Sequence, residues 1–155
     1  MIMLNSKETM LLQDEKKGEE LCVQKYKEYS SRASDQTLKD LFSNISNEEQ
    51  QHLDSINQIL SGSLPAMNSQ QGQQTQQSQQ TQPAASTSSS SGSSCDKMLC
   101  EDSLATEKYI SSSYNTGIFE FRDPNVRQIL NHIQKEEQQH GEQIYNYMNQ
   151  HGMYN

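Results

Sequence analysis

Apolar residues in the N-terminal part of the chain recur every three or four positions, which is the spacing of one face of an α-helix. A first helix is expected from about Lys7. Its apolar side consists of Leu11, Leu12, Glu15, Glu19, Cys22, Val23, Tyr26, Tyr29 and Ala33. Ser34-Asp35-Gln36 then breaks the pattern and offers an N-cap for a second helix. That helix is expected to end at Ser61-Gly62, and its apolar side consists of Leu38, Leu41, Phe42, Ile45, Glu49, His52, Leu53, Ile56, Ile59 and Leu60.

The same plan returns in the C-terminal part of the chain. A third helix is expected near Asp96–Phe121, with Leu99, Cys100, Leu104, Glu107, Tyr114, Ile118 and Phe121 on its apolar side. Asp123-Pro124 is a typical helix start, with Asp as the cap and Pro at the first helical position. The fourth helix is expected to end at Gly152, and its apolar side consists of Val126, Ile129, Leu130, Ile133, Glu137, His140, Ile144, Tyr147 and Met148. No stretch shows a convincing strand pattern, so the sequence predicts an all-α bundle.

The two halves are related by an internal repeat. The pentapeptide Glu-Glu-Gln-Gln-His occurs at 48–52 and again at 136–140, 88 residues further on. Each copy has a glutamate thirty positions before its second Glu, namely Glu19 and Glu107. Three further pairs keep the same register: Tyr26 and Tyr114, Asp35 and Asp123, Ile45 and Ile133. The chain is therefore a duplicated unit of the form Glu … Glu-x-x-His.

A low-complexity segment, 61–94, separates the two halves, with a Gln-rich part at 70–82 and a Ser-rich part at 86–94. Such a composition buries too little apolar surface to offset the conformational entropy that is lost when the segment becomes ordered, so we predict a disordered linker. Residues 7–60 and 95–150 are then two helical hairpins of one bundle domain. A helix of about 25 residues is about 38 Å long, and the linker can span it. This favours the long crossover of ferritin-like four-helix bundles, because a simple up-and-down arrangement does not need one.

Each repeated pentapeptide directs one glutamate and its histidine inward. At about 100° per residue, Glu49 lies about 25° from the centre of its helix's apolar face, and Glu48 about 75° away. Glu137 lies about 30° and Glu136 about 70° from the centre of theirs. Both histidines and both upstream glutamates also fall within the apolar stripes. Six ionisable side chains are therefore expected in one small core.

Four carboxylates and two imidazoles are the ligand set of di-iron and di-manganese carboxylate bundles. Buried charges are costly unless they are paired or bound to metal, and this mixed ligand set suits iron or manganese. We therefore predict two divalent metal ions, iron or manganese, as cofactors. The predicted ligands are Glu19, Glu49, His52, Glu107, Glu137 and His140. Glu49 and Glu137 are expected to bridge the metals, the other four ligands to be terminal, and Tyr26 and Tyr114 to donate hydrogen bonds from behind the ligands.

Other interpretations of these residues stay open at this stage. Glu and His on bundle helices usually face solvent, and a duplication copies such residues without any function. The six residues could also share protons in a polar network that holds no metal. Glu15 lies on the same apolar face, with Ser103 as its counterpart in the repeat. It is either a further ligand or part of a frayed bundle end.

Charge and targeting signals exclude other classes of function. The formal net charge is −8 and no basic patch is present, which makes nucleic acid an unsuitable partner. No apolar run has the length that a membrane span needs, and the N-terminus lacks the pattern of a signal peptide, so we expect cytoplasmic synthesis. Cys22, Cys95 and Cys100 form no Cys-x-x-Cys pair and are expected to be free thiols. Intermolecular disulfides through Cys95 and Cys100 are the alternative.

Two family resemblances follow from these motifs. The spacing Glu-x6-Tyr-x2-Tyr in 19–29 resembles the first helix of the rubrerythrin-like branch of the ferritin-like superfamily. The C-terminal half resembles, more specifically, the Coat F family of bacterial spore coat proteins. This likeness covers Leu104-Ala105-Thr106-Glu107-Lys108, Ser112-Ser113-Tyr114-Asn115-Thr116, Asn125-Val126-Arg127-Gln128-Ile129-Leu130, Glu-Glu-Gln-Gln-His and Gly152-Met153-Tyr154.

The Coat F resemblance implies a structural or accessory role in the spore coat of an endospore-forming bacterium, with other coat proteins as partners, and implies no enzyme activity. We expect a coat component with a dinuclear metal site. The alternative is a di-iron or di-manganese redox enzyme acting on peroxide or oxygen, either a rubrerythrin-like peroxidase or oxidase or a manganese-catalase-like enzyme. The chain lacks the rubredoxin-like Cys-x-x-Cys pair of rubrerythrins, and a homodimer is left open. Cross-linking through the Gln-rich tract, and oxidative coupling of Tyr145, Tyr147 and Tyr154, are further hypotheses.

Overall fold

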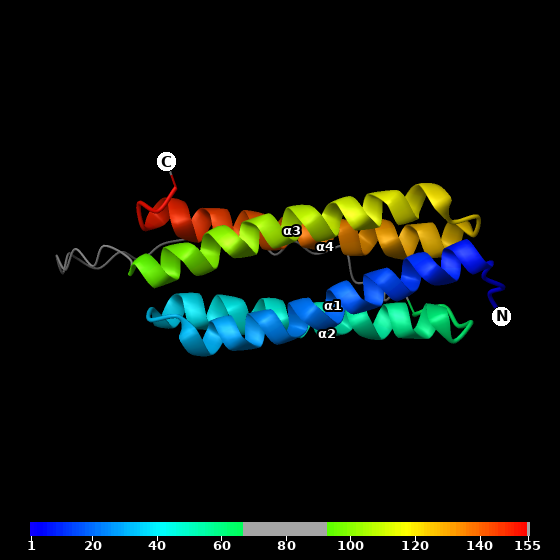
Figure 1. Ribbon diagram of the computed structural model, residues 1–155, viewed down its shortest axis with the longest axis horizontal. Helices are drawn as coiled ribbons and strands as arrows, with labels where there is room; N and C mark the ends of the chain where they lie inside the picture. Colours follow the sequence, from blue (N-terminus) through cyan, green and yellow to red (C-terminus); the bar gives the residue numbers. More distant parts are fainter. Residues whose placement is uncertain (67–92, 155) are drawn as a thin grey trace.

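Four long α-helices make up the computed structural model, which describes residues 1–66 and 93–154 (Figure 1). They are α1 (Ser6–Arg32), α2 (Gln36–Leu60), α3 (Ser94–Glu120) and α4 (Pro124–Gln150). Within the described residues no strand occurs, and the predicted all-α four-helix bundle of two hairpins is confirmed. The prediction of a disordered linker over 61–94 falls mainly on 67–92, outside the described residues. Among the described residues, no helix is long and apolar enough to cross a membrane.

Helix ends follow the local signals of the sequence. Asp35 caps α2 and Asp123 caps α4, which has Pro at its first position, as predicted. Gly62 and Gly152, just after α2 and α4, have φ of 85° and 64°, a left-handed backbone that glycine adopts without strain. The capping box of α1, in which Asn5 and Glu8 exchange side-chain and backbone hydrogen bonds, was not predicted from the sequence.

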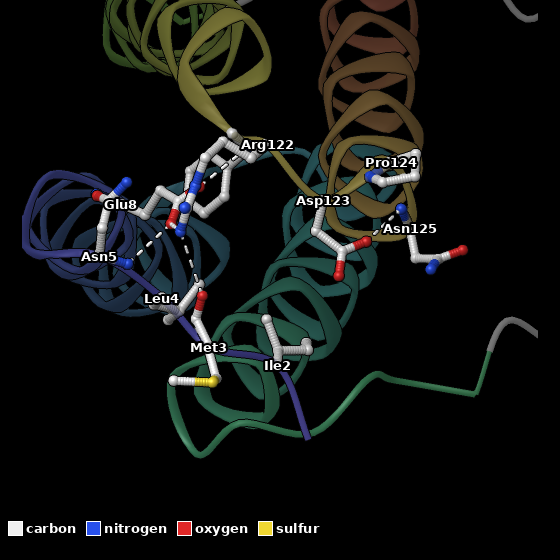
Figure 2. A pocket seen from close by; sticks show the side chains of 10 residues that line it. Ile2, Met3, Leu4, Asn5, Glu8, Arg122, Asp123, Pro124 and Asn125 are labelled. Atoms are coloured by element: carbon white, nitrogen blue, oxygen red, sulfur yellow. Dashed lines mark hydrogen bonds and ion pairs between the residues drawn. The ribbon is translucent and has the colours of Figure 1, made fainter.

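An ion pair joins the start of α1 to the end of α3. Figure 2 shows the Arg122 side chain lying over Glu8, and two guanidinium nitrogens donate to its carboxylate at 3.2 and 3.1 Å. The hydrogen bond from this guanidinium is the main cause that lowers the pKa of Glu8 to about 2. At the other end of the bundle, the Asp96 carboxylate accepts a 2.8 Å hydrogen bond from the backbone N–H of Ser34. These contacts require α1 and α3 to run antiparallel.

The chain crosses the bundle between its two hairpins. Because α2 and α3 are both antiparallel to α1, they run parallel to each other, so the end of α2 and the start of α3 lie at opposite ends of the molecule (Figure 1). The intervening segment therefore connects opposite ends, which is the ferritin-like topology rather than an up-and-down one. In this arrangement α1 packs on α2 and α3, and α4 packs on α3 and α2.

The apolar core lies on both sides of a charged middle. Its fully buried side chains include Leu12, Leu38, Phe42, Ile45, Ile56, Ile59, Leu99, Leu130, Ile133 and Ile144. The Phe42 ring packs against Tyr26 and Tyr29, with ring centroids 5.7 and 5.8 Å apart.

Two sequence hypotheses about reactive side chains need correction. Cys100 is fully buried, so it cannot reach another chain, whereas Cys95 is exposed, and all three cysteines are free. Tyr147 is also buried. Its hydroxyl donates to Asp35 at 3.0 Å, and its ring stacks on His151. Oxidative coupling at Tyr147 is therefore wrong on grounds of access.

Candidate metal centre

All six predicted ligands meet in the interior of the bundle. Their side-chain ligand atoms form two groups of four, and within each group these atoms lie within 4.8 Å of one another. One group consists of Glu19, Glu49, His52 and Glu137, and the other of Glu49, Glu107, Glu137 and His140. Every helix contributes, since Glu19 lies on α1 and Glu107 on α3, while α2 and α4 each supply a Glu and a His. Glu49 and Glu137 belong to both groups, which is the position of a bridging carboxylate.

The spacing Glu-x-x-His places both side chains of a pair on one helix face, because residues three apart are neighbours on a helix. His52 Nδ1 lies 3.1 Å from Glu49 Oε2 and 3.3 Å from Glu137 Oε1. His140 Nδ1 lies 3.4 Å from Glu49 Oε1 and 3.4 Å from Glu137 Oε2. The two imidazole rings stack with centroids 5.7 Å apart. Both Nδ1 atoms therefore face the shared carboxylates.

The outer nitrogen of each histidine contacts a carboxylate from the other half of the chain. His52 Nε2 lies 2.7 Å from Glu136 Oε2, and His140 Nε2 lies 2.6 Å from Glu48 Oε2. A carboxylate at Nε2 holds the proton there and leaves Nδ1 free to bind a metal. The sequence pattern did not assign a role to these two glutamates, although the Glu-Glu pair occurs in both copies of the repeat.

The two predicted tyrosines also form hydrogen bonds between the two halves of the chain. The Tyr26 hydroxyl on α1 donates to Glu107 on α3, and the Tyr114 hydroxyl on α3 donates to Glu19 on α1. Each tyrosine is fully buried, so its hydroxyl has exchanged water for this carboxylate. The hydrogen bonds orient one oxygen of each terminal glutamate and leave the other oxygen to face the centre.

Unpaired polar atoms are concentrated at this centre. In the described part of the chain, the buried side-chain atoms without a hydrogen-bond partner are Glu15 Oε2, Glu19 Oε2, Glu49 Oε1, Glu107 Oε2, Glu137 Oε1, Glu137 Oε2 and His140 Nδ1. Each such atom costs about 1–3 kcal/mol of desolvation, and more when it is charged. All but the Glu15 oxygen belong to the two groups of potential ligands, so bound cations would satisfy them.

Without a cation, the centre must hold protons. Burial and the neighbouring carboxylates raise the pKa of Glu19 well above its usual range, and burial is the main cause that raises the pKa of Glu107 to about 9. Burial alone would lower the pKa of His52, but the adjacent carboxylates of Glu136, Glu137 and Glu49 outweigh it and raise that pKa strongly. Cations and protons therefore compete for this site.

Glu15 lies near the centre but in neither group of four. It is buried in the middle of α1, and Ser113 Oγ donates to its Oε1 at 2.7 Å. It is therefore not part of a frayed end. Burial, as the main cause, raises the pKa of Glu15 to about 7. At the equivalent position, the buried Ser103 bonds to the Leu99 carbonyl at 2.7 Å, so Glu15 makes the two halves unequal.

The second hairpin is similar in sequence to a known protein family. Residues 95–155 match the Coat F domain. The second hairpin of this protein is therefore similar to that domain. The match covers α3 and α4 and therefore three of the six potential ligands, Glu107, Glu137 and His140. The first hairpin supplies the remaining three. No curated protein matches this chain at a significant level.

A solved structure shows the fold of the whole bundle. The crystal structure of a two-domain protein from Anabaena variabilis, containing DJ-1/ThiJ/PfpI-like and ferritin-like domains, is similar with a TM-score of 0.70 and 14% sequence identity. The match covers 96% of this chain and 37% of that one, so this chain spans little more than a third of that protein. The two hairpins thus form a bundle with a ferritin-like fold.

Proposed function

We propose that this protein is a spore coat component whose ferritin-like bundle holds a dinuclear centre of two divalent metal ions, iron or manganese. The observation that carries the centre is the set of unpaired, buried carboxylate and imidazole atoms in two overlapping groups of four. Mixed carboxylate and imidazole ligands suit iron and manganese. The similarity of the second hairpin to the Coat F domain supports a location in the spore coat.

The residues have distinct roles in this proposal. Glu49 and Glu137 would be shared by the two metals, because both are fully buried and belong to both groups. His52 and His140 would each hold one metal through Nδ1. Glu19 and Glu107 are terminal ligands, oriented by the two crossing tyrosines. When bound, such a metal pair supplies Lewis acidity and redox chemistry toward peroxide or dioxygen.

Elemental analysis of the purified, untagged protein tests the centre. We expect about two iron or manganese ions per chain, as in other carboxylate bundles, and loss of both in a Glu49→Ala, Glu137→Ala variant. Glu28→Ala, which changes an exposed glutamate on α1, is the matched control and should retain both metals. A wild-type protein that stays metal-free after dialysis against iron(II) and manganese(II) would contradict the centre.

A metal-dependent oxidoreductase acting on peroxide or oxygen is the second candidate function. It is favoured by a groove between α3 and α4 whose lining includes Glu107 and Glu137. The two functions are compatible, because a coat protein can carry a redox site. Peroxide and oxygen consumption by the metal-loaded protein, compared with the Glu49→Ala, Glu137→Ala variant, tests this function directly.

We also propose the spore coat as the site of assembly after cytoplasmic synthesis, with other coat proteins and a second copy of this chain as partners. Exposed apolar side chains on α1 and α3 support an interaction surface; they are Met10, Leu21, Met98, Tyr109 and Phe119. Tyr145 and Tyr154 are exposed and in edge contact, with ring centroids 4.8 Å apart, which supports coupling there. The Gln-rich tract lies outside the described residues.

Fractionation of purified spores tests the location. The protein is expected in detergent-resistant coat extracts and absent from the spore core. Recovery only from the core or from the mother-cell lysate would contradict a coat role without bearing on the metal centre.

A further inference from the structure

A groove of about 610 Å³ lies between α3 and α4 and reaches the proposed centre from one side. Its lining includes the two ligands Glu107 and Glu137, together with Ser111, Gly141 and Tyr145. Both ligands have buried oxygens without a hydrogen-bond partner. The groove therefore joins the protein surface to unsatisfied carboxylates rather than to a closed apolar core.

The internal repeat shows that the equivalent positions of the first hairpin carry larger, apolar side chains. With the 88-residue offset, Gly141 corresponds to Leu53 and Ser111 corresponds to Val23. Both Leu53 and Val23 are buried, so apolar side chains occupy these positions between α1 and α2. The terminal ligands differ accordingly, since Glu107 is 4% exposed and its counterpart Glu19 is 0% exposed.

No packing contact accounts for the glycine at 141. It lies inside α4, where glycine weakens a helix relative to alanine, and a Cβ added there would meet nothing within 4 Å. Gly18 on α1 is different, because a Cβ there would lie 3.0 Å from Ile110 Cδ1 on the neighbouring α3. Close helix packing thus accounts for Gly18, whereas at Gly141 the missing side chain leaves open space beside the ligands.

We infer that the α3–α4 groove is the entrance through which a small neutral oxidant reaches the centre, and that Gly141 and Ser111 keep it open. This inference rests on the proposed metal centre. Besides the two ligand carboxylates, the lining contains Lys108 and Glu142, whose opposite charges offset each other, so the groove favours a neutral molecule over an ion. Dioxygen and hydrogen peroxide are both small and neutral.

Filling the groove tests the entrance. Gly141→Leu restores the residue of the first repeat, and Ser111→Val does the same from α3, so either variant serves if the other folds poorly. Gln139→Leu adds the same leucine to α4 at an exposed position outside the groove and is the matched control. Metal content and thermal unfolding are measured first for all three variants and the wild type.

Access is then measured with nitric oxide, a neutral diatomic probe, mixed by stopped flow with the iron(II)-loaded proteins. We expect the rate of the optical change to fall by about tenfold or more in Gly141→Leu, with unchanged final amplitude and metal content, and to stay at the wild-type value in Gln139→Leu. Peroxide and oxygen consumption then show which oxidant uses the entrance, because only that reaction slows in Gly141→Leu.

The outcomes separate this inference from the proposed function. Two metals per chain with equal nitric oxide rates in wild type, Gly141→Leu and Ser111→Val would overturn the entrance and leave the centre standing. If the nitric oxide reaction were slowed in Gln139→Leu as much as in Gly141→Leu, the entrance would also be overturned. Absence of metal from the wild type would overturn the centre, and the entrance with it.

Discussion

At the level of single residues, the centre depends on which atom of each histidine faces which carboxylate. His52 and His140 direct Nδ1 toward the shared glutamates and Nε2 toward Glu136 and Glu48. The two outer carboxylates come from the opposite hairpin, so each imidazole is held between both halves of the chain. A change at either outer glutamate should therefore alter the centre without removing a ligand.

Replacing Glu48 and Glu136 by Gln is expected to weaken metal binding by about 10–100-fold, because an amide is a poorer acceptor for the Nε2 proton than a carboxylate. Calorimetric titration of the metal-free protein with manganese(II) measures the effect. Glu101→Gln, at an exposed position on α3, is the control and should bind as the wild type does. Wild-type affinity in the double variant would show that the outer carboxylates do not support the imidazoles.

At the level of helices, Gly18 in α1 and Gly141 in α4 have opposite surroundings. Helix formation alone favours alanine over glycine by about 0.5–1 kcal/mol. Alanine adds this stability only at positions where its methyl group has room. The Ile110 side chain, 3.0 Å from a Cβ at Gly18, must move to admit one, whereas the space beside Gly141 is open.

Gly141→Ala is therefore expected to raise the free energy of unfolding by about 0.5–1 kcal/mol, and Gly18→Ala is expected to give less than this or to destabilise. Urea unfolding of both variants under identical conditions measures the difference. Equal stabilisation by the two changes would mean that the α1–α3 contact relaxes without cost.

At the level of the whole molecule, a charged centre divides the apolar core, and its protonation links stability to pH. The pKa of Glu15 is raised to about 7 and that of Glu107 to about 9, in both cases chiefly by burial. A raised pKa in the folded state means that the neutral carboxyl is favoured by folding. Its contribution is complete below the unfolded pKa of 4.5 and is lost as the pH rises through the folded value.

The metal-free protein should therefore lose stability as the pH rises from about 4.5 to about 9, and bound metal should reverse this trend, because it replaces the protons and neutralises the carboxylates. Calorimetric melting with a chelator, and again with manganese(II), measures both curves. In the Glu15→Gln variant the loss between about pH 4.5 and 7 should become smaller, because the share of Glu15 is removed while that of Glu107 remains. A metal-free protein whose melting temperature rises over this range would contradict the protonation assigned to the centre.

Much of this molecule follows from local pattern. The helices, their Asp35 and Asp123 caps and the inward direction of Glu49 and Glu137 depend on spacing within one helix, where geometry is regular. The 88-residue repeat then indicates six inward ligands in two equivalent sets. These features are determined by the sequence alone because they need no knowledge of how the helices pack.

The contacts between helices could not be predicted from the helical pattern. The crossing of Glu48 to His140 and of Tyr26 to Glu107, the burial of Cys100 and Tyr147, and the place of Glu15 beside the centre depend on distances between segments far apart in the chain. The groove beside Gly141 is of the same kind, since a missing side chain becomes an opening only where the neighbouring helix leaves the space unfilled. The helical period determines the direction of a side chain, whereas tertiary packing determines which residues that side chain contacts.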